Sequence, residues 1–340
     1  MKVLVIGPDY FNYTSSVTWA LNKLGHNAIE KTWVGFYGNC NYIAKKLSKL
    51  GISSFKRQYY RDWNEKLIDH CKSYNPDICF IINGEWIFDE TMAMFKQKGI
   101  KLILYLIDSI IRLPENESKL YFYDRIFSFE PKDQDYIANK FSLTCSYLPV
   151  GYDPRFYYQD NSVKQDIDIS FIGANTPNRL SLLREVANHA KNNGLKLAVY
   201  GHYWSDKYWW KKEKIVKKID PLHLFIENRK IPPSIVGSVY RRSKICLNIH
   251  IPEHEGVNPR TFEILACGAF QLIDTRKDMK KFLNNNEHLV SYLNSRELIE
   301  KIEYYLNNYN ERKVIASQGC NYVENNYSVI STIARIMEQV

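Results

Sequence analysis

Several patterns that would assign a function at once are missing from this sequence. It has no Walker-type phosphate-binding loop and no GxGxxG turn, which argues against a P-loop kinase and against a standard dehydrogenase. The first half shows no Asp-x-Asp pair beside a nucleotide-binding turn, so nothing there predicts a metal-bound diphosphate. No stretch has low complexity and no repeat of solenoid period is visible, so a repeat protein is also excluded.

Disulfide bridges and long apolar runs are missing as well. The seven cysteines are scattered, odd in number and never arranged as CxxC, which favours reduced, buried thiols in a cytoplasmic protein. The N-terminal run MKVLVIGPDY is too short for a signal peptide, and no later run approaches the length of a membrane span. We therefore expect a cytoplasmic protein that is soluble or, at most, peripheral at the inner face of the membrane.

The sequence does contain enough apolar material for two domains, together with an excess of positive charge. Its 340 residues are 45% hydrophobic and 14% aromatic, which by the usual size of a core allows two domains. The formal charge of +9 suits an anionic partner, whether a nucleic acid, a phosphorylated small molecule or an acidic membrane surface. A nucleic acid is the least expected of these, because the basic residues are dispersed and no winged, zinc or ribonucleoprotein motif occurs.

Strand and helix patterns alternate along the chain. Between helical stretches at residues 15–24 and 60–74, the first half carries the strand-like runs KVLVIG, DICFIING, KLILYLID and RIFSFE. After a patch rich in Pro, Gly and Asp at residues 148–162, the alternation restarts with DISFIG, KLAVYG, LHLFIE, KICLNIH and FQLID. This order predicts an α/β protein with two doubly wound, Rossmann-like domains that face a cleft.

The same alternation places the domain boundaries. We expect an N-terminal domain over residues 1–155, a C-terminal domain over residues 156–322 and a separate C-terminal helix over residues 323–340. Ligands of open α/β sheets bind beyond the carboxyl ends of the strands. Residues that directly follow the strands are therefore the first candidates for a site.

The segment HEGVNPRTFEILACGAFQLID, residues 254–274, places charged residues, an Asn-Pro pair and glycines between apolar runs. It follows a predicted strand, and its PRTFEILACG part has helical spacing that ends at Gly268. Asn258 is a good N-cap residue and Pro259 suits the first helical position. The helix therefore begins at the mouth of the expected cleft, where its free N–H groups favour an anion.

Two residues inside this helix can be explained either by ligand binding or by an ordinary structural role. Arg260 adds a fork of donors suited to phosphate, and the plain alternative is a solvated arginine on an ordinary capped helix. Glu263 lies between Phe262 and Ile264, whose surroundings are expected to be buried. A carboxylate in such a place must find hydrogen-bond donors, which favours the functional explanation.

A metal-binding pattern overlaps the same segment. His250, Glu253 and His254 spell HxxEH, which binds zinc in peptidases when it lies on one helix. Here Pro252 interrupts the pattern and the preceding residues form a strand, so the histidines would not share a helical face. We therefore expect no metal site.

At this point the sequence resembles a known family. Glu255 and Glu263 are separated by seven residues, as in the E-x7-E pattern of retaining glycosyltransferases with the GT-B architecture. The longer run SKICLNIH…GVNPRTFEILACGAFQLID resembles the CgeB-like branch of the group 1 glycosyltransferases, named after spore maturation proteins. Similar runs are DISFIGANTPNRLSLL, YLPVGYDPRFY and NYVENNYSVISTIARI, so the resemblance covers most of the second half and, more loosely, the first.

The resemblance implies a donor site in the second half. Glu263 would accept hydrogen bonds from the donor ribose. Glu255 would act as a catalytic residue that binds hydroxyls of the transferred sugar, together with backbone N–H groups such as that of Gly256. The helix start from Asn258 to Thr261 would face the donor pyrophosphate, in agreement with the anion site expected at this helix start.

Further site residues are expected around these, Arg179 from the resemblance and His202 and Asp108 from their places directly after strands. Basic groups would supply the charge that a metal gives other transferases, and Arg179, just after the turn at Gly173, joins Arg260 in that role. His202, after the strand KLAVYG, would line the donor pocket. Asp108 would be a catalytic residue facing the sugar or the acceptor, and its alternative role is a helix cap after its strand.

The implied function is retaining transfer of a sugar from a nucleotide-diphosphate sugar to a protein, glycan or lipid-linked glycan, without metal or other cofactor. A GT-B-like sugar-nucleotide epimerase is the main alternative, and a basic nucleic-acid-binding protein is less favoured. The C-terminal helix would cross back onto the first domain through Val329, Ile333 and Ile336, and the domains would close by bending near residues 150–165. The basic stretch Trp209–Lys218 is either a solvated helix face or a contact with a membrane surface or an anionic acceptor.

Overall fold

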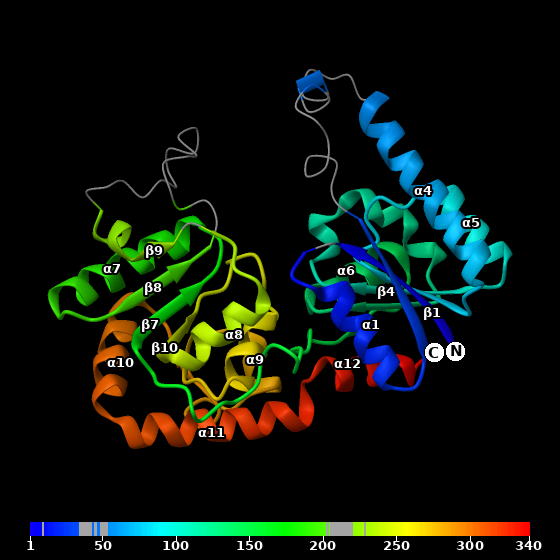
Figure 1. Ribbon diagram of the computed structural model, residues 1–340. Coiled ribbons are helices and arrows are strands. Elements are labelled where there is room, and N and C mark those ends of the chain that lie inside the picture. The colour runs from blue at the N-terminus through cyan, green and yellow to red at the C-terminus, as the bar shows by residue number, and fades with distance from the viewer. Residues whose placement is uncertain are drawn as a thin grey trace. The chain divides into compact units, whose positions relative to one another are not determined.

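The computed structural model describes residues 1–8, 10–33, 43, 46–47, 54–201, 204, 220–227 and 229–340. These residues divide into two compact units, which we call unit 1 (Met1–Val150 with Val329–Val340) and unit 2 (Gly151–Ser328). In each unit, helices pack around one six-stranded sheet whose paired strands run parallel (Figure 1). The expected α/β fold with two parallel-sheet domains is confirmed.

The sheet of unit 1 has the strand order β2-β1-β3-β4-β5-β6. Its strands are β1 (Lys2–Pro8), β2 (Asn27–Trp33), β3 (Ile78–Ile82), β4 (Lys101–Leu106), β5 (Arg125–Ser128) and β6 (Ser146–Tyr147). Its helices include α1 (Tyr13–Lys23), α4 (Ser54–Tyr74), α5 (Asp89–Gln97), α6 (Lys132–Phe141) and the short 3-10 helices η1 (Ile110–Arg112) and η2 (Pro114–Phe122). From β1 the chain runs to β2 on one side of β1 and then to β3 on its other side. The strand order therefore reverses between β1 and β3.

Unit 1 is completed by the last helix of the chain, α12 (Val329–Met337). Val329, Ile333 and Ile336 are buried against Val17 and Leu21 of α1 in one apolar core, as the sequence predicted. The preceding helix, α11 (Tyr309–Asn326), belongs to unit 2, because its residue Val323 is buried in the core there. The helix that crosses to unit 1 therefore starts at Val329, six residues after the expected boundary.

The sheet of unit 2 has the order β12-β11-β10-β7-β8-β9. Its strands are β7 (Ile167–Ile172), β8 (Leu197–Tyr200), β9 (Ile226–Glu227), β10 (Ser243–Asn248), β11 (Gln271–Asp274) and β12 (Val290–Tyr292). Its further helices are α7 (Pro177–Asn192), α8 (Pro233–Arg242), α9 (Pro259–Ala266) and α10 (Ser295–Asn307), with the 3-10 helices η5 (Pro221–Phe225) and η6 (Lys277–Lys281). Here the order reverses between the neighbouring strands β7 and β10.

The prediction of a strand at LHLFIE is largely wrong. LHLFIE forms the 3-10 helix η5 over most of its length and only the two-residue strand β9 at its end. Asp220 caps η5 by accepting a hydrogen bond from the Leu222 N–H at 3.0 Å, and Pro221 fits the first position of the turn. The cap and the proline therefore outweigh the apolar character of the run.

Two expectations concern the compartment of the protein. Within the described ranges, no helix is long and apolar enough to cross a membrane. The six described cysteines are all buried and unbridged, as the sequence predicted. Cys40 and the basic stretch Trp209–Lys218 lie outside the described residues.

Candidate functional site

The carboxyl edge of the unit 2 sheet, at the strand reversal, brings together most of the expected donor-site residues. The loop after β7 contains Gly173 and leads into α7, which begins at Pro177. The loop after β10 contains Glu255 and Gly256 and leads into α9, which begins at Pro259. Because β7 and β10 are hydrogen-bonded neighbours, both loops lie at the place where ligands bind in open α/β sheets.

The start of α9 is held by a buried network of amides and hydroxyls. Asn258 is the expected N-cap, and its Oδ1 accepts a hydrogen bond from the Thr261 N–H at 3.1 Å. Asn248, fully buried at the end of β10, donates to Thr261 Oγ1 at 2.9 Å and to Gln271 Oε1 at 2.8 Å. The network fixes the positive end of the helix dipole at the strand reversal, which is the arrangement that suits an anion.

Two arginines converge on one aromatic ring beside this helix start. The Cζ atoms of Arg179 and Arg260 lie 5.6 Å and 5.9 Å from the ring centroid of Phe171. Arg179 is only 4% exposed and donates to the carbonyls of Ile249 at 2.9 Å and Ala174 at 3.1 Å. Burial, and then the charge of Arg260, lower the pKa of the Arg179 guanidinium. A bound anion would relieve the repulsion between these two like charges.

A buried histidine, His250, and a partly exposed aspartate, Asp274, join the ends of β10 and β11. Asp274 accepts a hydrogen bond from the His250 backbone N–H at 2.9 Å, and its carboxylate lies 2.7 Å from His250 Nδ1. Arg276 forms an ion pair with the same carboxylate. Burial lowers the pKa of His250, so its neutral ring accepts at Nε2 from the Asn258 N–H at 3.3 Å.

His250 therefore orders the loop that leads into α9 instead of serving as part of an HxxEH helix. His254 lies in the loop between β10 and α9, so the two histidines do not share a helical face. Within the described ranges, no group of three or more His, Cys, Asp or Glu side chains is arranged to hold a metal ion.

Glu263 occupies the middle of α9, and the pKa of its carboxyl is shifted from the ordinary value. Burial raises the pKa of its carboxyl to about 7, although the charge of Arg260 and a hydrogen bond from Tyr157 act in the opposite direction. The neighbours Phe262 and Ile264 are fully buried, as expected. Such a carboxyl is well placed to gain from additional donors, such as ligand hydroxyls, that stabilise its charged form.

Glu255, the first glutamate of the E-x7-E pattern, is more open to solvent. Its side chain is 36% exposed and its carboxylate lies 3.9 Å from Lys277 Nζ. The next residue, Gly256, is buried, so the chain turns inward at once toward the start of α9. The two glutamates thus differ in surroundings, one solvated and one largely enclosed.

The glycine turn after β7 is packed against the end of β8. Gly201 has φ of +148°, and a Cβ there would lie 1.9 Å from the Gly173 carbonyl oxygen. Trp204 is fully buried and donates from its indole nitrogen to the same carbonyl at 3.1 Å. Trp204 is therefore a packing residue of this turn, and His202 lies outside the described residues.

In unit 1, Asp108 follows β4 at the carboxyl edge of the sheet. Its Oδ1 accepts hydrogen bonds from the Ser109 N–H and from Arg112 Nη1, both at 3.0 Å. The cap of η1 is Ser109, whose hydroxyl accepts from the Ile111 N–H. Asp108 thus stands beside the cap without being the cap residue itself.

The sequence analysis did not predict three polar residues near Asp108 at the strand reversal of unit 1, namely Asn83, Tyr10 and Glu85. Asn83, after β3, accepts hydrogen bonds from the Ile107 N–H at 3.0 Å and the Asp108 N–H at 3.3 Å. It also donates to the Tyr10 hydroxyl at 3.3 Å. Burial raises the pKa of the nearby Glu85 to about 7. The polar letters NGE directly after the strand DICFII are the signal that could have found them.

Comparison with known proteins agrees with this geometry. Residues 179–338 match a family described as glycosyl transferase-like. The chain is 24% identical over 268 residues to the spore protein CgeB of Bacillus subtilis, and the match covers 74% of this chain and 78% of that protein.

Solved structures share the fold across the whole chain. A glycosyltransferase from Rickettsia africae matches with a TM-score of 0.67 and 15% identity, covering 99% of this chain and 97% of that one. HepE from Anabaena, solved with UDP-glucose, matches with a TM-score of 0.65 and 11% identity, covering 100% of both chains. The protein is thus a glycosyltransferase with the GT-B fold. The family match over residues 179–338 and the CgeB relative show that the chain is similar to CgeB-like glycosyltransferases.

Proposed function

We propose that the protein transfers a sugar from a nucleotide-diphosphate sugar to an acceptor hydroxyl. One observation carries this proposal: the cationic pair Arg179 and Arg260 lies at the same strand reversal as Glu255 and Glu263. A diphosphate requires positive charge, while ribose and sugar hydroxyls require acceptors. HepE, which has the same fold, was solved with UDP-glucose, so UDP-glucose is the first donor to test.

In this proposal the diphosphate lies against the start of α9, from Asn258 to Thr261, and against the two arginines. Glu263 accepts hydrogen bonds from the ribose, and Glu255 with the backbone at Gly256 holds the hydroxyls of the sugar. The positive charge stabilises the leaving diphosphate, which is the role of a metal ion in other transferases, so transfer needs no metal or cofactor.

The acceptor side is proposed for unit 1, at the carboxyl edge that carries Asp108. The carboxylate there is held by Ser109 and Arg112 and offers an acceptor for a hydroxyl proton. The acceptor is proposed to be a protein, a glycan or a lipid-linked glycan. The E-x7-E resemblance further supports transfer with retention of the anomeric configuration, which NMR of the first product formed would check.

The donor site is tested by comparing UDP with uridine. Arg260→Ala and Arg179→Ala should each weaken UDP binding by roughly tenfold or more, because each removes a charge-assisted contact to phosphate. Uridine binding should change little, since uridine carries no phosphate. Arg184→Ala is the matched control, because Arg184 lies farther along α7 and pairs with Asp220. Equal losses of UDP and uridine binding would show that the arginines do not face the phosphates.

A further inference from the structure

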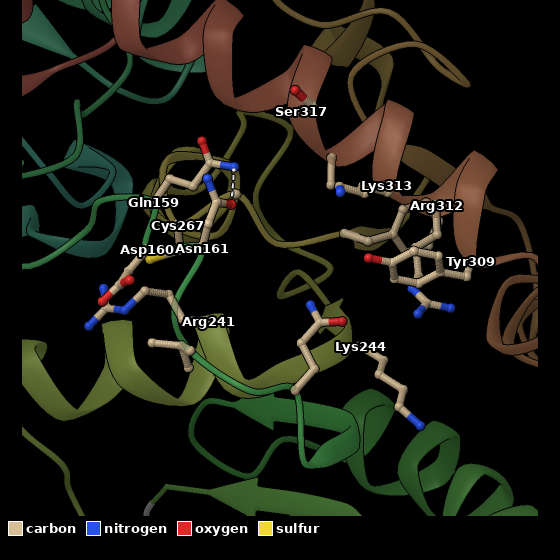
Figure 2. A pocket seen from close by; sticks show the side chains of 15 residues that line it. Gln159, Asp160, Asn161, Arg241, Lys244, Cys267, Tyr309, Arg312, Lys313 and Ser317 are labelled. Carbon is tan, nitrogen blue, oxygen red and sulfur yellow. Dashed lines mark hydrogen bonds between the residues drawn. The ribbon is translucent and has the colours of Figure 1, made fainter.

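Unit 2 contains a cationic cavity at the edge of its sheet opposite the proposed donor site. The cavity has a volume of about 800 Å³ and lies between the loop of residues 159–165, the start of β10, the end of α9 and the first turns of α11 (Figure 2). Its lining residues Lys244 and Gly268 lie at the start of β10 and just after α9. The proposed donor site lies at the other ends of these two elements, so an eight-residue helix, about 12 Å long, separates the sites.

The cavity lining carries a marked excess of positive charge. Arg241, Lys244, Arg312 and Lys313 line it together with a single carboxylate, that of Asp160. Lys244 is neutralised by an ion pair to Asp168 at 2.7 Å. Within the described part of the chain, the other three cations form no ion pair with a carboxylate.

The three cations without an ion pair lie on two walls of the cavity, and the charges of Asp160 and Asp168 act on Arg241 and Arg312 from a longer distance. Arg241, near the end of α8, donates only to the main-chain carbonyls of Phe156 at 3.4 Å and Tyr158 at 3.2 Å. Lys313 is an exposed residue of α11, and Figure 2 shows it on the side of the cavity away from Arg241. Neutral carbonyl oxygens orient the Arg241 guanidinium but leave its charge available to an anion.

Arg312 is the strongest indication of a ligand. It is 5% exposed, and both of its hydrogen bonds run from Nη1 to the carbonyls of Tyr305 and Leu306. In the described structure, its Nε and Nη2 have no hydrogen-bond partner, although its side chain lines the cavity. Burying a guanidinium without a carboxylate is costly, and a bound anion would offset that cost. The first turn of α11, which begins at Tyr309 without a side-chain cap, adds partial positive charge on the same wall.

We propose that this cavity binds a phosphorylated organic molecule with more than one anionic group, held between Arg241 on one wall and Arg312 with Lys313 on the other. The volume lies in the range of small-molecule sites. The half-exposed ring of Tyr309, which lies 5.5 Å from Arg312 Cζ, offers a surface for the organic part. A soluble phosphate ester and a lipid headgroup share this chemistry.

The test measures binding of inorganic pyrophosphate by calorimetry to the full chain carrying Arg260→Ala, so that the proposed donor site is weakened. This variant should still bind pyrophosphate, and adding Arg241→Ala or Lys313→Ala should weaken that binding by roughly tenfold. Adding Lys191→Ala, an exposed lysine of α7 outside the cavity, should leave it unchanged. Lys313→Arg should restore binding lost in Lys313→Ala, which separates loss of charge from loss of folding.

A second arm distinguishes the source of the phosphate. The same variants are sedimented with vesicles of phosphatidylglycerol and, as a control, of phosphatidylcholine. Binding to the anionic vesicles that depends on Lys313 assigns the cavity to a lipid headgroup, and pyrophosphate binding alone assigns it to a soluble ligand. The proposal is overturned if neither pyrophosphate nor anionic vesicles distinguish the Lys313→Ala and Arg241→Ala variants from the Lys191→Ala control. Because all variants carry Arg260→Ala, this outcome is independent of the donor-site proposal.

Discussion

We expect donor binding to strengthen as the pH rises through 7, because of Glu263. Its carboxyl has a pKa raised to about 7 by burial, so about half of the molecules carry it protonated at neutral pH. A protonated carboxyl has lost much of its capacity to accept hydrogen bonds from ribose hydroxyls. If Glu263 contacts the ribose as proposed, binding must favour the ionised form and release a proton.

The size of the effect follows from the same pKa. The ionised fraction rises from about a tenth at pH 6 to about nine tenths at pH 8, so the affinity for uridine should rise by up to about tenfold over this interval. At pH 7 about half a proton should be released for each ligand bound. Burial lowers the pKa of the nearby His250, and the Glu263→Gln variant separates any contribution of His250 from that of Glu263.

Calorimetry of uridine binding in buffers with different ionisation enthalpies measures both quantities. Uridine is the best probe because it has no phosphate that titrates in this range. Glu263→Gln keeps the shape of the side chain and removes its titration, so binding should become weaker and independent of pH. A flat profile for the wild-type protein, or the same slope in Glu263→Gln, would refute the contact between Glu263 and the ribose.

The remaining predictions concern the fold and the metal requirement. In a denaturant titration, Gly201→Ala should destabilise unit 2 by about 2 kcal/mol or more, because the new Cβ would collide with the Gly173 carbonyl. The control is Gly194→Ala, which has a positive φ but open space around it and should cost about 1 kcal/mol. Ile333→Ala should lower the free energy of unfolding by about 2 to 5 kcal/mol, because this side chain is fully buried between α12 and the rest of unit 1. The control is Ile235→Ala, which should change the free energy of unfolding by less than about 0.5 kcal/mol because Ile235 is half-exposed. Transfer activity, assayed with UDP-glucose, should persist in EDTA, and activity that returns only with Mg²⁺ or Mn²⁺ would contradict metal independence.

The sequence predicted those strands that are buried on both faces. β1, β3 and β4 are continuous apolar runs because helices cover the sheet on each side, and such runs are visible without any knowledge of neighbours. β2 was not predicted, because this edge strand alternates polar and apolar residues in NAIEKTW. The apolar content of LHLFIE favours a strand, whereas the local cap formed by Asp220 favours the 3-10 helix that the structure contains.

The features of the candidate site likewise divide into those set by the local sequence, which could be predicted, and those set by neighbouring strands, which could not. The capped start of α9 was predictable because an N-cap depends on residues three positions apart in the chain. The pairing of His250 with Asp274 was not, because it depends on β10 and β11 being neighbours in the sheet. The convergence of Arg179 and Arg260 on Phe171 likewise joins α7, α9 and β7, and only the resemblance placed the two arginines together.

The charge of +9 illustrates why composition alone could not locate a site. It is the difference between 46 basic and 37 acidic side chains, and many of the basic ones pair on the surface, as Arg242 does with Asp166 at 2.6 Å. The arginines assigned to ligands have a different environment. Within the described chain, Arg179 and Arg312 are nearly buried and donate hydrogen bonds only to neutral carbonyls. Because desolvating an arginine without a carboxylate partner is costly, such residues indicate anion sites more specifically than the total charge does.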